Sequence, residues 1–140
     1  MNSYDDQNVF AKILRGEIPS FKIYEDDDTL AFMDVMPRSK GHCLVIPKRP
    51  SRNLLDIDAQ DLSKVITTVQ KVMRAAKKAF NADGITIQQF NEVAAGQEVF
   101  HTHIHILPRY DGLKMGPPGI MAENMDELAQ QATAIAAAIE

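Results

Sequence analysis

The sequence predicts a single α+β domain whose sheet is mainly antiparallel. The chain has 140 residues, a length typical of one domain. Short runs rich in β-branched and aromatic residues follow one another across polar turns, as in hairpins. One long amphipathic helix separates them into two groups, without the regular strand and helix alternation of a parallel sheet. We expect one domain over residues 1–140, with its core at about 8–110 and a helical tail at about 124–139.

The first elements are a short helix and a hairpin. Residues 8–15 carry apolar side chains at helical spacing, with two aspartates before them and Gly16 after them, which marks both ends of a helix. Residues 21–24 and 29–33 are rich in β-branched and aromatic side chains, and the polar residues 25–28 lie between them. This arrangement predicts two antiparallel strands joined by a turn.

A third strand and the long helix follow. Residues 42–46 form a β-type run that ends at Pro47. Residues 58–80 repeat apolar side chains every three or four positions and carry lysine and arginine on the other faces, which is the pattern of a helix with one buried face. Asp58 is a favourable N-cap, so this helix is expected to begin there.

Two more strands and a final helix complete the chain. Residues 85–90 and 99–107 are strand-like, and a connection at 91–98 that includes Gly96 joins them. Residues 124–139 carry an apolar stripe at helical spacing. The strands are therefore expected to be linked mainly by turns, which favours antiparallel pairing.

The composition excludes several classes of protein. A formal net charge of -4 and a pI near 5.5 leave no general basic surface for nucleic acid. The longest apolar run, residues 134–139, is far shorter than the roughly 18 residues of a membrane helix. Residues 1–10 lack the apolar stretch of a secretion signal, so we expect a cytoplasmic protein. The single cysteine, Cys43, excludes an internal disulfide and a zinc site built mainly from thiolates.

Three of the four histidines lie at alternate positions in one predicted strand, namely His101, His103 and His105. Alternate residues of a strand project from one face, so the three imidazoles would form a row, while the mostly apolar residues between them would pack on a helix. Same-face neighbours are roughly 6.5 Å apart, whereas zinc holds its ligands at about 2.1 Å. The three rings of a straight strand cannot converge on one ion. Two of them could do so only with further ligands, and the neighbouring apolar residues offer no carboxylate.

Such a row suits nucleophilic catalysis at phosphorus. A neutral imidazole can attack the phosphorus atom while its neighbours orient it and bind the anionic oxygens. Gly96 and Gln97 lie just before the row, where a glycine turn lets backbone N–H groups approach phosphate and the amide can donate as well. A structural role is the simpler explanation for His42, which stands alone at the start of a strand.

The segment HTHIHILPR, residues 101–109, resembles the signature of the histidine triad (HIT) family. The resemblance covers roughly residues 9–109, because three more segments are similar to their HIT counterparts in the same order: FAKILRGEIPSFKIYEDDDTLAFMDV, PRSKGHCLVIPK and QQFNEVAAGQEVF. It implies a small α+β protomer that pairs as a symmetric homodimer by joining two sheets. It also implies hydrolysis or transfer of nucleotides at the α-phosphate.

The resemblance assigns roles to individual residues. His103 matches the central histidine, the nucleophile that accepts the nucleotidyl group, and His105 matches the histidine beside the α-phosphate. His101 matches the supporting first member of the triad, and His42 matches a histidine in the neighbouring strand. Asp34 matches the acidic residue that binds the ribose hydroxyls.

Two further sets of residues follow from the same resemblance. The loop that lines phosphate and ribose is matched by Asn91, Gly96, Gln97 and Val99. The pocket around the base is matched by Val9, Phe10, Ile13 and Phe32. For these four apolar side chains, packing in the core is an equally good explanation.

Many bacterial members that this chain resembles bind a structural zinc ion through a CxxC pair, an additional histidine and the first triad histidine. Here the corresponding segments are residues 9–12 (VFAK) and 49–51 (RPS), which offer neither thiolates nor histidine. We therefore expect no metal and no other cofactor.

The expected function is hydrolysis or transfer of a nucleotide, with an adenine nucleotide as the expected substrate, through a nucleotidyl-histidine intermediate. The leaving group would be an amine, as in phosphoramidases, or a phosphate chain, as in dinucleoside polyphosphate hydrolases. The alternative is a nucleotide-binding sensor or a partner-docking dimer with vestigial turnover. Turnover of a substrate panel, measured beside nucleotide binding, separates the two classes.

Overall fold

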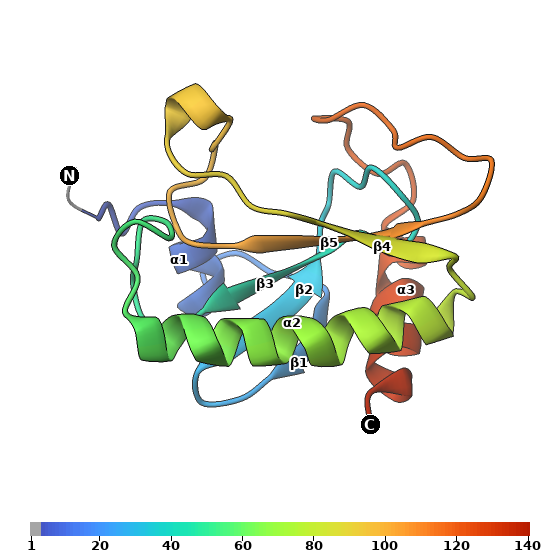
Figure 1. Ribbon diagram of the computed structural model, residues 1–140, viewed down its shortest axis with the longest axis horizontal. Helices are drawn as coiled ribbons and strands as arrows, with labels where there is room; N and C mark the ends of the chain where they lie inside the picture. Colours follow the sequence, from blue (N-terminus) through green and yellow to red (C-terminus); the bar gives the residue numbers. More distant parts are fainter. Residues whose placement is uncertain (1–3) are drawn as a thin grey trace.

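The computed structural model describes residues 4–140, and this part of the chain folds into helices packed on one sheet (Figure 1). The elements, in chain order, are α1 (Val9–Leu14), β1 (Lys22–Glu25), β2 (Thr29–Met33), β3 (Cys43–Pro47), α2 (Ala59–Ala79), β4 (Gly84–Gln88), the 3-10 helix η1 (Val93–Ala95), β5 (Ile104–Arg109) and α3 (Met125–Ala138). Every helix and strand expected from the sequence is present. The turn η1 was not expected.

The five strands form one sheet in the order β1-β2-β3-β5-β4, and every neighbouring pair is antiparallel. This confirms the predicted α+β class. In the register of the sheet, His105 of β5 lies opposite Leu44 of β3 on one side and Gln88 of β4 on the other. His105 is thereby fixed in the interior of the sheet, whereas the outer edge of β4 has no partner strand among the described residues.

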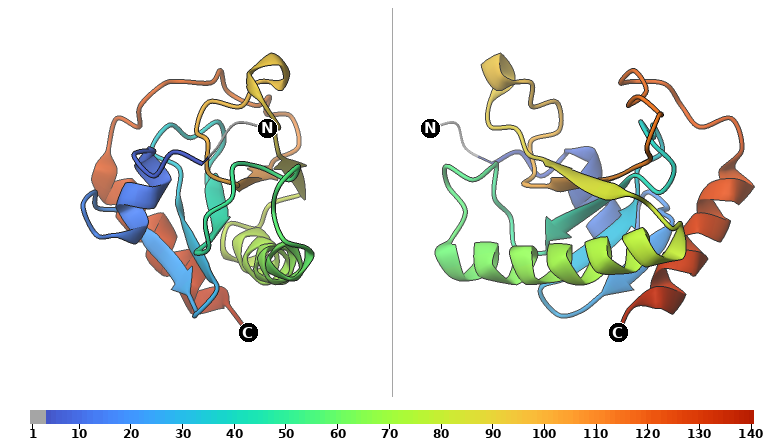
Figure 2. Two further views of the ribbon diagram at one scale, coloured as in Figure 1. Left: turned by 90° about the vertical axis from the view of Figure 1, so that its left-hand side faces the viewer. Right: turned by 45° about the vertical axis from the view of Figure 1, so that its right-hand side comes forward.

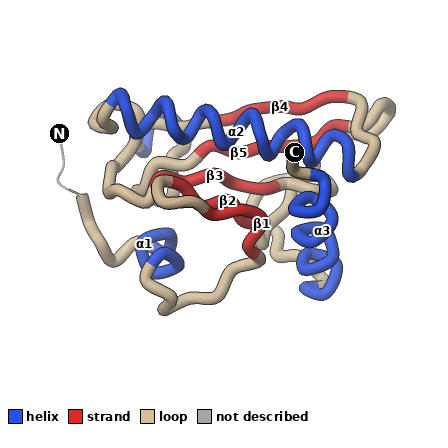
Figure 3. The backbone as a smooth tube through the Cα atoms, turned by 90° about the horizontal axis from the view of Figure 1, so that it is seen from below, coloured by secondary structure: helices blue, strands red, loops and turns tan. Residues whose placement is uncertain are grey.

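Helices cover both faces of the sheet. α2 and α3 pack together on one face, where Val45, Ile104 and Ile106 join the larger buried core. α1 lies on the other face, and its Phe10 packs with alternate residues of β2 and β3. Figure 2 shows α1 and α2 on opposite sides of the sheet, and Figure 3 shows α3 beside one end of α2. Because side chains alternate along a strand, His105 faces the α1 side.

Polar side chains cap the start of each α-helix. Asn8, Asp58 and Asn124 precede α1, α2 and α3, and each accepts a hydrogen bond from a backbone N–H of the first turn. Asp58 confirms the predicted start of the long helix. None of the helices within residues 4–140 has the length and apolar character needed to cross a membrane.

β5 begins at Ile104, later than the predicted start at residue 99. The residues before it bond outside the sheet. The N–H of Thr102 donates to the carbonyl of Ser51 at 2.9 Å, and the carbonyl of His101 accepts from the ring of His103 at 2.6 Å. The prediction of one strand carrying all three histidines is therefore wrong for His101 and His103, which are placed by an irregular segment.

The segment between β5 and α3 crosses to the loop that follows β2. The N–H of Gly116 donates to the carbonyl of Arg38 at 2.7 Å, and Nε of Arg38 donates back to the carbonyl of Gly116 at 2.8 Å. The N–H of Ala122 donates to the carbonyl of Val35 at 2.9 Å. Figure 1 shows the two loops side by side. These bonds hold residues 116–122 near the end of β2.

Candidate active site

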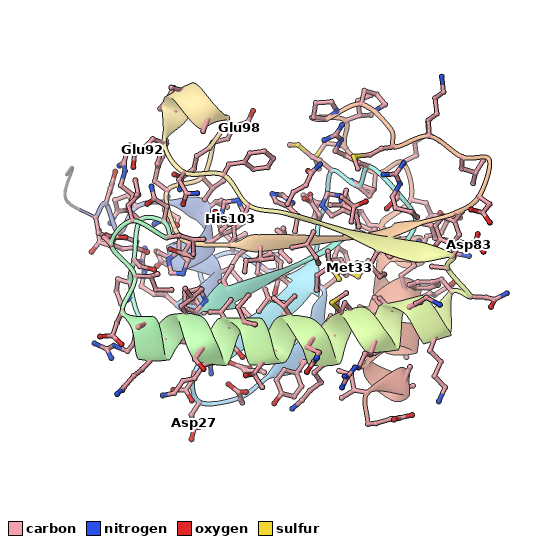
Figure 4. The ribbon with its side chains drawn as sticks, in the orientation of Figure 1. Asp27, Met33, Asp83, Glu92, Glu98 and His103 are labelled. Atoms are coloured by element: carbon pink, nitrogen blue, oxygen red, sulfur yellow. The ribbon has the colours of Figure 1, made fainter. Side chains whose placement is uncertain are left out.

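Histidine rings gather at one end of β5, on the α1 face of the sheet. The ring centroids of His103 and His105 are 5.1 Å apart, and those of His42 and His105 are 5.2 Å apart. The ring of Phe10 lies edge-on to His103, with the centroids 4.9 Å apart. Figure 4 shows His103 at this end of β5, below the loop that carries Glu92. The structure thus brings three of the four predicted histidines together, with His105 next to both His42 and His103.

The hydrogen bond of His103 fixes the position of its proton. Nδ1 lies 2.6 Å from the carbonyl oxygen of His101, which can only accept. Nδ1 therefore carries the hydrogen, and in the neutral ring Nε2 has the free lone pair. His103 is 7% exposed, and burial lowers its pKa because the charged ring is disfavoured away from water. A neutral imidazole with a free Nε2 is the form that attacks an electrophile.

His101 is held through both ring nitrogens. Nε2 lies 2.8 Å from the carbonyl oxygen of Pro47 and must donate, so Nδ1 is the acceptor. The hydroxyl of Tyr4 lies 2.6 Å from that Nδ1 and supplies the donor. The ring is fully buried, and burial lowers the pKa of His101 to about 4. With both nitrogens engaged inside the protein, His101 contributes its carbonyl to the orientation of His103.

A second chain of hydrogen bonds holds His42 and His105. The backbone N–H of Arg38 donates to Nδ1 of His42 at 3.0 Å, so Nε2 of His42 carries the hydrogen. This Nε2 lies 3.0 Å from Nδ1 of His105, which accepts and leaves its own Nε2–H as a donor. Burial lowers the pKa of His42 to about 4 and that of His105 to about 3. Both rings are therefore neutral at pH 7.

Asp34 lies beside this histidine pair. Its Oδ2 is 3.3 Å from Nε2 of His42 and 3.8 Å from Nδ1 of His105, and its Oδ1 accepts the N–H of Met36 at 2.8 Å. Because both imidazoles are neutral, these contacts are not ion pairs. Burial raises the pKa of Asp34 to about 6. The carboxylate is thus a hydrogen-bond acceptor at neutral pH in a partly desolvated position.

Asp34, His42 and His105 also offer ligand atoms within 4.8 Å of one another, the spacing of a metal site. Nδ1 of His42 is engaged by the N–H of Arg38, and its Nε2 carries the hydrogen. That ring therefore has no free lone pair for a cation. In this arrangement the three residues form a hydrogen-bonded group and do not fit a metal ion.

A cavity of about 340 Å³ opens beside Asp34 and His42. The four apolar residues predicted for the base pocket all line it: Val9, Phe10, Ile13 and Phe32. Phe10 and Phe32 also belong to the buried cluster under α1, so core packing and pocket lining coincide at these two positions. Residues 118–119 of the crossing segment are part of the same wall.

The side chain of Gln97 is fully engaged within the protein. Its Nε2 donates to the carbonyls of Arg52 at 2.7 Å and Val99 at 3.0 Å. Its Oε1 accepts from Nδ2 of Asn53 at 3.0 Å and from the N–H of Glu92 at 2.8 Å. The amide expected to donate to phosphate therefore has no free N–H in this arrangement, because both of its hydrogens hold the loop in place.

Of the other predicted loop residues, Asn91 and Gly96 shape the loop, whereas Val99 lines the cavity. Oδ1 of Asn91 accepts the N–H of Leu54 at 2.9 Å, and its Nδ2 donates to Gln89 at 2.6 Å, so this side chain also builds the loop. Gly96 has a φ of +99°, a left-handed conformation that favours glycine. Of the four predicted loop residues, Val99 lines the cavity.

Glu92 and its partners hold the loop above His103. Glu92 has φ 77° and ψ 160°, a backbone conformation that residues other than glycine rarely adopt. Its carboxylate accepts two hydrogen bonds from Arg52, at 2.8 and 3.0 Å, and one from Asn53 at 2.6 Å. These bonds hold the strained residue in one conformation. None of these three residues was predicted from the sequence, because no local pattern connects Arg52 with a carboxylate 40 positions away.

The HIT domain family model matches residues 15–112, more than half of the chain. The chain belongs to the HIT family, which confirms the resemblance found in the sequence. A crystal structure of a HIT-like protein involved in cell-cycle regulation from Bartonella henselae, with an unknown ligand, is 52% identical to this chain. Its TM-score is 0.93, and the match covers 99% of this chain and 100% of that one.

Two other similar proteins have more informative names. The structure of a hypothetical histidine triad nucleotide-binding protein from Sulfolobus tokodaii has a TM-score of 0.85 at 31% identity and covers 92% of this chain and 89% of that one. Adenylylsulfatase HINT3 of Arabidopsis thaliana is 43% identical over 101 residues, which are 72% of this chain and 51% of that protein. The family and these relatives support a nucleotide hydrolase or transferase as the kind of protein.

The neutral histidines predict that acid destabilises the fold. All four have folded pKa values below the ordinary value of 6.5, so the unfolded chain binds more protons as the pH falls below 6.5. Asp34 acts in the opposite direction, because its folded pKa of about 6 exceeds its ordinary value of 3.8. The three histidines whose folded pKa values are about 3 to 4 outweigh the one aspartate, so unfolding near pH 5 takes up about two protons from these groups, and the lowered pKa of His103 adds to this uptake.

Denaturant unfolding at pH 7, 6 and 5 should therefore show a free energy of unfolding that decreases steadily with acidification. NMR titration of the histidine ring protons provides the control, because none of the four rings should protonate near pH 6.5 in the folded protein. Constant stability over this range, or a triad histidine that titrates near 6.5, would contradict the assignment of neutral rings.

Proposed function

We propose that the protein cleaves nucleotides at the α-phosphate through a covalent nucleotidyl intermediate on Nε2 of His103. The observation that carries this proposal is the hydrogen bond from Nδ1–H of His103 to the carbonyl of His101, at 2.6 Å. It leaves the Nε2 lone pair free on a ring that burial keeps neutral. Both conditions of a nitrogen nucleophile are met at neutral pH.

The neighbouring groups suit the remaining parts of a nucleotide. The ring centroid of His105 lies 5.1 Å from that of His103. Nε2–H of His105 is a neutral donor, which is suited to a phosphate oxygen. Asp34 is an acceptor suited to ribose hydroxyls, and the apolar cavity beside it is suited to a base. We favour an adenine nucleotide, in keeping with the adenylylsulfatase among the relatives.

The chemistry takes two displacements. Nε2 of His103 forms a bond to the α-phosphorus while the bond from phosphorus to the leaving group breaks, and the leaving group departs with the displaced electron pair and takes up a proton. Water then attacks the same phosphorus, loses a proton and displaces the neutral imidazole, which releases the nucleoside monophosphate. The leaving group is an amine or a phosphate chain, and the two correspond to phosphoramidase and dinucleoside polyphosphate hydrolase activities.

Replacement of the nucleophile should separate binding from turnover. In His103→Ala, turnover of an adenosine phosphoramidate should fall by roughly 10⁴-fold or more, whereas AMP affinity should stay within a few-fold because the cavity and Asp34 are unchanged. Calorimetry and single-turnover kinetics measure the two quantities. Binding without turnover in the wild-type protein, over a panel that includes diadenosine polyphosphates, would instead favour a nucleotide sensor.

Stereochemistry provides a separate test of the intermediate. Two in-line displacements return the original configuration at phosphorus, whereas direct attack by water inverts it once. A chiral phosphorothioate substrate should therefore give net retention. Net inversion would remove the nucleophile role from His103.

We also propose that the protein is a homodimer. The outer edge of β4 lacks a partner strand among the described residues, and unpaired edges are usually covered. Ile87 on this strand is 42% exposed, and Ile66 on α2 is 50% exposed. Light scattering at micromolar concentration should give about twice the chain mass of 15.6 kDa. A monomer at that concentration would contradict the proposal.

A further inference from the structure

We propose that Tyr4 is a positioning residue for the nucleophile: its hydroxyl fixes the ring of His101, whose carbonyl in turn orients His103. The proposal rests on the proposed role of His103 as the nucleophile. It assigns a function to an N-terminal residue that lies 97 positions from its partner in the sequence.

The backbone N–H of Ala11 can only donate, and this fixes the direction of the hydrogen bonds from Asn8 to Tyr4 and from Tyr4 to His101. The backbone N–H of Ala11 donates to Oδ1 of Asn8 at 2.9 Å, so the amide of Asn8 turns its Nδ2 away from the helix. Nδ2 then donates to the hydroxyl oxygen of Tyr4 at 3.0 Å. The hydroxyl is left with its own hydrogen, which it donates to Nδ1 of His101 at 2.6 Å.

His101 receives this bond on one side and donates on the other. Its Nε2–H bonds to the carbonyl of Pro47 at 2.8 Å, and the whole residue is inaccessible to solvent. Without the hydroxyl of Tyr4, Nδ1 would be a buried acceptor with no donor, an arrangement that costs free energy. The ring would relieve this by rotating or by taking up a proton, and either change disturbs the carbonyl to which His103 is bound at 2.6 Å.

The same bonds connect the nucleophile to the helix that lines the cavity. Asn8 is the N-cap of α1, so its side chain serves both the first turn of the helix and Tyr4. α1 carries Phe10, which lines the cavity and contacts the ring of His103 edge-on. Tyr4 therefore lies between α1 and the triad, and its hydroxyl reaches His103 through His101.

Tyr4→Phe tests the proposal because it removes the hydroxyl and keeps the ring. We expect a roughly fivefold fall in kcat, the effect of one lost hydrogen bond, with KM within twofold because the cavity is unchanged. Tyr24→Phe is the matched control. Its hydroxyl bonds to Asp26 and Lys71, away from the histidines, and its loss should leave kcat unchanged.

Asn8→Asp provides a second variant that keeps the helix cap, since aspartate is also a good N-cap. The new carboxylate replaces the Nδ2 donor with an acceptor, so the hydroxyl of Tyr4 donates to it and no longer to His101. The kinetic effect should match that of Tyr4→Phe, although tyrosine is still present.

Long-range ¹H–¹⁵N NMR of the histidine rings reads the same change without any substrate. In the wild-type protein His101 should carry its hydrogen on Nε2 alone, and in both variants this single form should be lost. The proposal is overturned if kcat and the His101 spectrum are unchanged in both variants, or if Tyr24→Phe lowers kcat equally. If the wild-type protein turns over no nucleotide, the proposed function fails, and the NMR result alone decides the role of Tyr4.

Discussion

The site depends on one hydrogen bond, from Nδ1–H of His103 to the carbonyl of His101. A backbone carbonyl accepts and never donates, so this bond selects one tautomer of the ring and one direction for its free lone pair. Burial acts in the same sense, because it lowers the pKa of His103 and keeps the ring neutral. Position, tautomer and protonation state thus arise from a single arrangement of the segment before β5.

The surrounding bonds support this arrangement from two directions. On the buried side, Tyr4 and Pro47 hold the ring of His101 through its two nitrogens. On the side of the sheet, the N–H of Arg38 orients His42, which leaves His105 with a donor beside the nucleophile. Each ring therefore has one nitrogen that donates and one that accepts. The ring of His103, with its free lone pair on Nε2, lies next to the ring of His105, with its Nε2–H, and attack on a phosphate requires such a pair of acceptor and donor.

The local pattern of the sequence was sufficient for the helices, the strands and the fold class. The cap at Asp58 and the apolar spacing of the long helix are properties of neighbouring residues, and the structure confirms them. The sequence also identified the histidine cluster, but strand alternation placed His101 and His103 wrongly, because the segment before Ile104 bonds to Ser51 and to its own side chains instead of the sheet. Partners such as Tyr4 and Glu92 were missed for the same reason: their bonds join segments that are distant in the sequence.

The most direct test of the account is a neutron diffraction structure of the ligand-free protein near pH 7, because it locates the hydrogens on each ring. The account predicts hydrogen on Nδ1 of His103 with Nε2 bare, and hydrogen on Nε2 alone in His101, His42 and His105. Hydrogen on Nε2 of His103, or a doubly protonated ring in the cluster, would contradict it.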